Sequence, residues 1–188
     1  MLGCCAGLPP ARPPGFVTPG SRAAAVLVPV FEEGDEAHVI LTKRPETLPS
    51  HQGEIAFPGG KALEGEALRD AALREAHEEI GLEPSHVEIV AELDGLATVA
   101  SRFSIAPFVG VLDGRPELRP DPAEVDTVLD VPISELLADG VFREERWDLW
   151  EPDRSVYFFD LPDETVWGAT ARILTAFLTD LVADRRDV

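Results

Sequence analysis

Apolar residues occur along the chain in two kinds of run, and together these runs predict alternating strands and helices. Short apolar runs bounded by Gly, Pro or Asp predict strands, whereas apolar positions at i and i+4 predict helices. The clearest helix spans 66–80, where Ala72, Ala76 and Ile80 form one stripe before a terminating glycine. Strands are expected at 23–31, 37–42, 54–57, 86–93, 103–112, 147–150 and 155–159, and further helices at 132–138 and 165–183. The alternation favours an α/β fold of layered sheets and helices.

The chain divides into a short tail and one larger region. Residues 1–20 are rich in Pro, Gly and Ala, which predicts a flexible N-terminal tail or an arm lying on the body. Residues 21–188 contain no internal repeat and no linker. A chain of 188 residues suits one domain with a sizeable core, so we expect 21–188 to be a single domain.

The formal net charge of −19 excludes several classes of partner. Nucleic acids and anionic membranes bind through Lys and Arg, so neither is expected as a partner. No apolar run approaches the ~20 residues of a membrane span, and no secretory signal is evident, so a cytoplasmic location is expected. An acidic protein that acts on an anionic substrate needs a local cation, which a bound divalent metal would supply.

The strongest functional signal lies in and just before helix 66–80. Glu75 and Glu79 are one turn apart on one helix face, and Glu78 borders that face. All-oxygen ligands of this kind suit Mg²⁺ or Mn²⁺. A solvated acidic face is the alternative for any isolated Glu-Glu pair. The surrounding residues favour a metal site, because seven of them fit the spacing G-x5-E-x7-R-E-U-x-E-E-x-G-U, with U an aliphatic residue: Gly60, Glu66, Arg74, Glu75, Glu78, Glu79 and Gly81.

This motif resembles the signature of the Nudix hydrolases, which cleave pyrophosphates linked to another group. One position departs, since Ala76 stands where Ile, Leu or Val is usual. The resemblance implies an α/β/α sandwich with mixed β-sheets. It also implies a metal site whose ligands are Glu75 and Glu79, with Glu78 as a third or water-mediated ligand and the backbone carbonyl of Gly60 or its neighbour.

Two other motif residues have expected roles beside the metal. Arg74 is expected to orient a motif carboxylate through a charge-assisted pair. Glu66 is expected to hold the preceding loop to the helix. The glycines at 59 and 60 carry no Cβ, so backbone can approach metal and phosphates there.

Catalysis also needs a general base, and the motif alone does not identify it. In chains of this kind the base lies in the motif or on a distant loop. Glu124, within the loop 121–125, is the distant candidate, and Glu78 is the next. The alternative for Glu124 is an ordinary loop acid.

A second motif, over 41–60, resembles that of the coenzyme A pyrophosphatase branch, L-L-T-x-R-S-x3-R-x3-G-x3-F-P-G-G. Pro45 and Pro49 depart from it, at positions where Ser and Arg are usual, and Ile40 replaces the first Leu. With further agreement at 101–110 and 167–171, the resemblance covers about residues 23–175. The positions that agree with the second motif are Leu41, Thr42, Arg44, Gly53 and Phe57 to Gly60.

The implied reaction is metal-dependent hydrolysis of the pyrophosphate of coenzyme A, or a derivative, to 3′,5′-ADP and 4′-phosphopantetheine. The candidate contacts to this small-molecule substrate are Lys43, Arg44, Gly59 and Arg102, although a solvated basic pair explains Lys43 and Arg44 equally well. Trp147, Trp150, Tyr157 and Trp167 could stack on adenine, but such aromatics are more often core.

Two other functions remain open from sequence. The first is a Nudix hydrolase acting on ADP-ribose, dinucleoside polyphosphates or nucleoside triphosphates, against which the 41–60 motif argues. The second is a non-catalytic nucleotide-binding module on the same fold. Such modules usually lose motif carboxylates, whereas this chain keeps all four glutamates.

Overall fold

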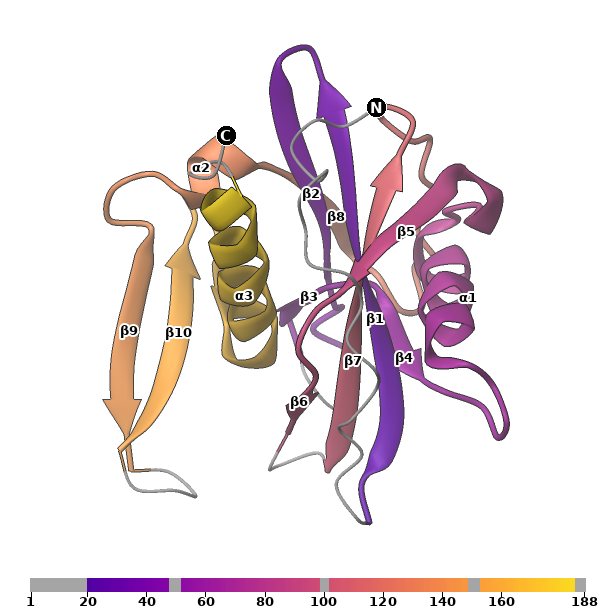
Figure 1. Cartoon of the computed structure of the whole chain (residues 1–188), viewed down its shortest axis with the longest axis horizontal. Coiled ribbons are helices and arrows are strands. Elements are labelled where there is room, and N and C mark those ends of the chain that lie inside the picture. The colour runs from indigo at the N-terminus through magenta and orange to yellow at the C-terminus, as the bar shows by residue number, and fades with distance from the viewer. Residues whose placement is uncertain (1–19, 48–51, 99–101, 149–152, 185–188) are drawn as a thin grey trace.

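A large mixed sheet lies at the centre of the computed structural model, with helices on both of its faces (Figure 1). The structure describes residues 20–47, 52–98, 102–148 and 153–184. The elements in chain order are β1 (Arg22–Glu33), β2 (Glu36–Lys43), β3 (Ile55–Ala56), β4 (Gly59–Lys61), α1 (Leu68–Ile80), the 3-10 turn η2 (Pro84–His86), β5 (Val87–Glu92), β6 (Leu96–Ala97), β7 (Phe103–Leu112), β8 (Thr127–Pro132), α2 (Ile133–Leu136), β9 (Phe142–Trp147), β10 (Arg154–Asp160), β11 (Thr165–Trp167) and α3 (Gly168–Asp184).

The large sheet runs in the order β3-β2-β1-β7-β5, and β4, β6 and β8 pair with β1, β7 and β2. The β1–β7 pair is parallel and the other pairs are antiparallel, so the sheet is mixed. A second, antiparallel sheet of β9, β10 and β11 lies on the far side of α3 (Figure 1). The α/β/α sandwich with mixed sheets expected from the resemblance is therefore confirmed.

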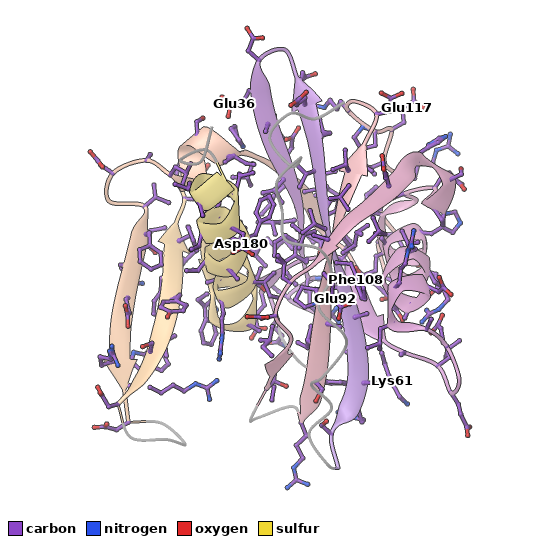
Figure 2. The ribbon with its side chains drawn as sticks, viewed as in Figure 1. Glu36, Lys61, Glu92, Phe108, Glu117 and Asp180 are labelled. Carbon is purple, nitrogen blue, oxygen red and sulfur yellow. The ribbon has the colours of Figure 1, made fainter. Side chains whose placement is uncertain are left out.

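Two hydrophobic clusters fill the space on either side of the large sheet. Strand side chains alternate between faces, so a strand covered on both faces is a continuous apolar run, as β1 is. On one face Val28 and Leu41 pack with Phe177 of α3, and on the other Leu27 and Ile40 pack with α1. Figure 2 shows the charged side chains Glu36, Glu117 and Lys61 toward the periphery and Phe108 near the middle of the sheet.

Two predicted helices begin later in the structure than in the sequence analysis. The first starts at Leu68 rather than Glu66, because the Glu66 carboxylate accepts the Leu63 backbone N–H, 2.8 Å away, and holds the turn before the helix. The last helix starts at Gly168 rather than 165, because residues 165–167 pair with β10 as strand β11.

The strand predicted at 147–150 was wrong in position. β9 spans Phe142–Trp147, and residues 149 and 150 lie outside the described residues. Four charged residues lie between Phe142 and Trp147, and exposed positions alternate with half-buried ones along the strand, which is typical of a strand with one solvated face. Strand β4 was missed because Gly59–Lys61 has no apolar pattern, and its pairing depends on β1 lying alongside.

Apart from Gly20, the tail predicted at 1–20 lies outside the described residues, so the division at residue 20 stays a prediction. Within the part of the chain that the structure describes, no helix has the length and hydrophobicity needed to cross a membrane.

Candidate active site

The motif helix lies very close to the sheet, because small residues form its inner face. Ala72 and Ala76 are fully buried, and α1 packs on β1 and β4. Ala76 therefore fills the position where the motif usually has a larger aliphatic residue. The two glycines of β4 allow equally close packing: a Cβ on Gly59 would lie 2.4 Å from the Ala25 carbonyl oxygen, and a Cβ on Gly60 would lie 2.3 Å from Oε2 of Glu75. The first contact is with backbone, so position 59 requires glycine, whereas a side chain at position 60 would force the Glu75 carboxylate to move.

Glu79 is a buried carboxylate that faces the backbone of β4. The residue is 5% exposed, and its Oε2 accepts the Gly59 N–H at 3.2 Å. Burial raises the pKa of Glu79 to about 7, with a further increase from the charges of Glu124 and Glu75, although the Gly59 hydrogen bond and Arg44 act in the opposite direction. An ionised carboxylate in such a place is stabilised by a nearby cation.

Arg74 holds three motif carboxylates in place, which is the kind of contact expected from the sequence. Its Nε donates to Oε1 of Glu66 at 2.8 Å, and its Nη2 donates to Oε2 of the same carboxylate at 3.0 Å. Its Nη1 donates to Oε1 of Glu75 at 2.8 Å and to Oε2 of Glu78 at 3.0 Å. The bond from Arg74 lowers the pKa of Glu66, so this carboxylate stays ionised. Arg74 thus ties the loop before α1 to the helix and fixes the direction of Glu75.

The oxygen atoms around β4 fit a hard divalent cation. Glu75 gives one oxygen to Arg74 and turns the other toward Gly60, while Glu79 lies beside Gly59. Among the described residues, no three Asp, Glu, His or Cys side chains are gathered tightly enough to hold a metal as they stand. Glu78 contributes to this result, because its side chain is 56% exposed and pairs with Arg74. The oxygen atoms that could meet a cation beside β4 are those of the Glu75 and Glu79 carboxylates, which are ligands of the kind that Mg²⁺ and Mn²⁺ prefer.

Glu124 lies on a loop that is fastened to the end of the motif helix. The backbone N–H groups of Arg119 and Asp121 donate to the carbonyls of Ile80 and Glu79, at 2.8 and 2.9 Å. Val125 is buried and anchors the other end of the loop. Glu124 itself is exposed, yet it is near enough for its charge to raise the pKa of Glu79. The fold therefore brings together two acids that are 45 positions apart in the sequence.

Arg44 lies next to this acidic site and has unused hydrogen-bonding capacity. Its backbone N–H donates to the Glu54 carbonyl at 3.0 Å, which fixes the end of β2. Its Nε is buried and has no hydrogen-bond partner among the described residues. A buried unpaired donor costs free energy, and a phosphate oxygen would satisfy it. Among the three candidate basic residues, Arg44 is the one whose charge acts on Glu79.

The other two candidate basic residues lie in different surroundings. Lys43 forms an ion pair with Glu164, which raises the pKa of Lys43, and its carbonyl accepts the Asp126 N–H. Lys43 therefore links β2 to the turn before β11, through a partner that the sequence pattern did not indicate. Arg102 is exposed at the start of β7, where its carbonyl accepts the Arg22 N–H, and no contact in the described part of the chain joins it to the motif carboxylates.

Comparisons with known proteins agree with this fold and site. A family model described as the NUDIX domain matches residues 21–158. The chain is 34% identical over 168 residues to "Uncharacterized Nudix hydrolase NudL" of Photorhabdus laumondii, and the match covers 89% of this chain and 88% of that protein. The chain therefore has the Nudix fold and keeps all four glutamates of the motif. The protein belongs to the Nudix family.

Two longer plant proteins from Arabidopsis thaliana are also similar. The chain is 44% identical to "Nudix hydrolase 22, chloroplastic" and 37% identical to "Nudix hydrolase 15, mitochondrial", each over 161 residues and 81% of this chain. It spans about half the length of these curated relatives, 53% and 56%. Their names place them in two different organelles, so the cytoplasmic location stays a prediction.

Solved structures support the fold alone. A MutT/nudix family protein from Enterococcus faecalis has a TM-score of 0.57 at 18% identity, covering 89% of this chain and 64% of the other. The Nudix hydrolase RenU from M. smegmatis has a TM-score of 0.54 at 21% identity, covering 62% and 74%. At these identities the likeness says nothing about substrate.

Proposed function

We propose that this protein is a metal-dependent pyrophosphohydrolase and that coenzyme A, or a derivative of it, is its substrate. One observation carries the proposal: the buried carboxylate of Glu79 lies against the glycine backbone of β4, within electrostatic reach of Arg44, whose buried Nε has no partner in the described chain. A cation would stabilise the ionised carboxylate of Glu79, and an anion would satisfy the buried Nε of Arg44. A metal-bound pyrophosphate satisfies both.

In this proposal Glu75, Glu79 and the carbonyl of Gly60 or its neighbour hold the metal. Glu78 serves as a further or water-mediated ligand after a change of side-chain rotamer, which its exposure allows. Bound Mg²⁺ or Mn²⁺ would neutralise the pyrophosphate and lower the pKa of an attacking water. Arg74 keeps Glu75 in position through their 2.8 Å hydrogen bond. It acts as a positioning residue.

Glu124 is the proposed general base. It is exposed, near enough for its charge to raise the pKa of Glu79, and lies on a loop whose backbone is fixed to α1 by two hydrogen bonds. A base in that place can take the proton of a water held beside Glu79. Arg44 would bind a phosphate oxygen through its free Nε. Gly59, whose missing side chain lets β4 pack tightly on β1, would present its backbone to the phosphate. Lys43, tied to Glu164, would help only by shaping the end of β2.

The choice of coenzyme A as the substrate depends on the 41–60 motif and is the most specific part of the proposal. The departures at Pro45 and Pro49 keep ADP-ribose, dinucleoside polyphosphates and nucleoside triphosphates as alternatives. The test is product analysis with coenzyme A, ADP-ribose and dATP side by side, with Mg²⁺ and with Mn²⁺. Release of 3′,5′-ADP and 4′-phosphopantetheine is expected. Cleavage of ADP-ribose alone would overturn the substrate, and binding without cleavage of any of them would favour a non-catalytic module.

A further inference from the structure

The small sheet carries a row of aromatic side chains on the face that is turned away from α3. Trp167 and Phe158 are direct cross-strand partners, and their rings are stacked, with centroids 6.4 Å apart and an interplanar angle of 11°. Trp147 completes the group, at 5.9 Å from Phe158 and 6.4 Å from Trp167. The aromatic row is defined by these three residues. Its members hold one another in place, so their surface is preorganised.

The strand pattern shows which way the row faces. Val166 and Phe159, the neighbours of Trp167 and Phe158, are buried in the core with α3. Side chains alternate along a strand, so the row faces the opposite side. Phe158 is 7% exposed, because its neighbours cover it, whereas Trp167 is 43% exposed. The indole of Trp167 is therefore the part of the aromatic row that a ligand can contact, while Phe158 supports it from the side.

The cation next to Phe158 is already paired. Arg143, the partner of Phe158 on β9, has its guanidinium carbon 3.9 Å from the ring centroid of Phe158. Its Nε donates to Asp160 at 2.6 Å, and it also pairs with Glu145. Arg154, the cross-strand partner of Trp147, lies four residues along β10 from Phe158, at the other end of the row from Trp167. The surface next to Trp167 therefore offers aromatic area beside an arginine that is already paired, which suits a flat, neutral heterocycle.

The row is connected to the proposed site through the end of β2. Glu164, just before β11, pairs with Lys43, which precedes Arg44. Strand β3, which pairs with the same end of β2, also contacts β11. From Glu164 to Trp167 the chain advances three residues, or about 10 Å at the rise of an extended strand. The contact between β11 and β3 therefore lies beside the end of β2 that Arg44 follows, where the phosphate of a nucleotide is proposed to lie.

We propose that the aromatic row is the stacking surface for the nucleobase of the substrate, with Trp167 as the residue that touches the base. The inference rests on the proposed function only for the place of the phosphate. Stacking of a base on an aromatic side chain contributes a factor of about 5 to 150 in affinity. The row would thus select nucleotide substrates among other pyrophosphates.

The test compares two ligands that differ only in the base. 5′-AMP and ribose 5-phosphate carry the same phosphate, and neither contains a pyrophosphate, so binding can be measured by calorimetry with Mg²⁺ whether or not the protein is a hydrolase. Wild type is expected to bind 5′-AMP more tightly. Trp167→Ala should weaken 5′-AMP binding about 5- to 150-fold and leave ribose 5-phosphate unchanged, and Trp167→Phe should retain most of the preference.

Phe142→Ala is the matched control. Phe142 is 44% exposed and lies on the same sheet, but on its other face, where it contacts Tyr157 and Phe159. Its removal should leave the preference for 5′-AMP intact. An equal preference in wild type and Trp167→Ala, or none in wild type, would overturn the proposal. So would a Trp167→Ala variant that loses only discrimination between acyl-coenzyme A and coenzyme A, because the row would then bind the acyl end. Loss of the 5′-AMP preference in a protein that cleaves none of the tested pyrophosphates would support the row and refute the proposed function.

Discussion

Glu79→Gln should make the metal-free protein more stable at alkaline pH while it removes activity. Burial raises the pKa of Glu79 from the ordinary 4.5 to about 7. The folded state therefore binds a proton more tightly than the unfolded state, and stability falls as the pH rises from about 4.5 through about 7. At about 1.4 kcal/mol per pKa unit, the complete loss is about 3 kcal/mol. Glutamine cannot ionise, and its amide oxygen can still accept the Gly59 N–H.

The measurement is urea unfolding of both proteins in EDTA at pH 5 and pH 8. The free energy of unfolding of wild type relative to Glu79→Gln should decrease by about 2–3 kcal/mol between these two pH values. Glu78→Gln is the control, since it removes one charge from the same helix at a side chain that is 56% exposed. Because that side chain is not buried, its replacement should not reproduce the change of about 2–3 kcal/mol.

Adding Mg²⁺ at pH 8 should reverse the order of stability. A ligand that binds only the folded state stabilises it by about 2.7 kcal/mol at 100 times its dissociation constant. Wild type should gain this stability and Glu79→Gln should gain much less, while its kcat falls by about 10² or more. A stability difference that is the same at pH 5 and pH 8 would refute the reasoning about burial. Near-normal turnover of Glu79→Gln at saturating Mg²⁺ would remove Glu79 from the metal ligands.

Three other variants or substrates test separate parts of the site. Glu124→Gln should lower kcat by about 10²–10⁴ with little change in metal affinity, and a rate within about threefold of wild type would move the base to Glu78. Gly60→Ala should reduce kcat and weaken Mg²⁺ binding, because its Cβ would lie 2.3 Å from Oε2 of Glu75. Unchanged Mg²⁺ affinity in a calorimetric titration would contradict that packing argument. Coenzyme A should have a higher kcat/KM than dephospho-coenzyme A, because one charged contact to its 3′-phosphate is worth about 10–150-fold. Equal values would show that the 3′-phosphate is not recognised.

The sequence predicted the layers and the motif helix because local patterns encode them. The stripe of Ala72, Ala76 and Ile80 fixed one face of α1, and the glycine after it fixed the end. Strands β4 and β11 could not be predicted in the same way. Gly59–Lys61 has no pattern of its own, and Thr165–Trp167 continues into α3, so each becomes a strand only through its partner.

For the candidate site, the sequence predicted which residues carry charge but not which charges are already paired. The motif spacing indicated Glu75, Glu79 and Arg74, all of which the structure places around β4. By contrast, Lys43 and Arg44 are equivalent in the sequence. Strand geometry separates them, since one pairs with Glu164 and the other keeps a buried, unpaired Nε. Pairing over 121 positions leaves no local signal.

Because alanines form the buried face of the motif helix, the distance between this helix and the sheet controls the geometry of the candidate metal site. Ala72 and Ala76 contribute no length between α1 and β1, so the positions of Glu75 and Glu79 are set almost directly by two backbones. A single added methylene there forces those backbones apart, typically at a cost of about 1–3 kcal/mol. A folded variant of this kind would have all its carboxylates and still lack a usable metal geometry. A screen for folded but inactive variants should therefore recover substitutions at apolar core positions such as Ala25, together with substitutions of Glu75 and Glu79.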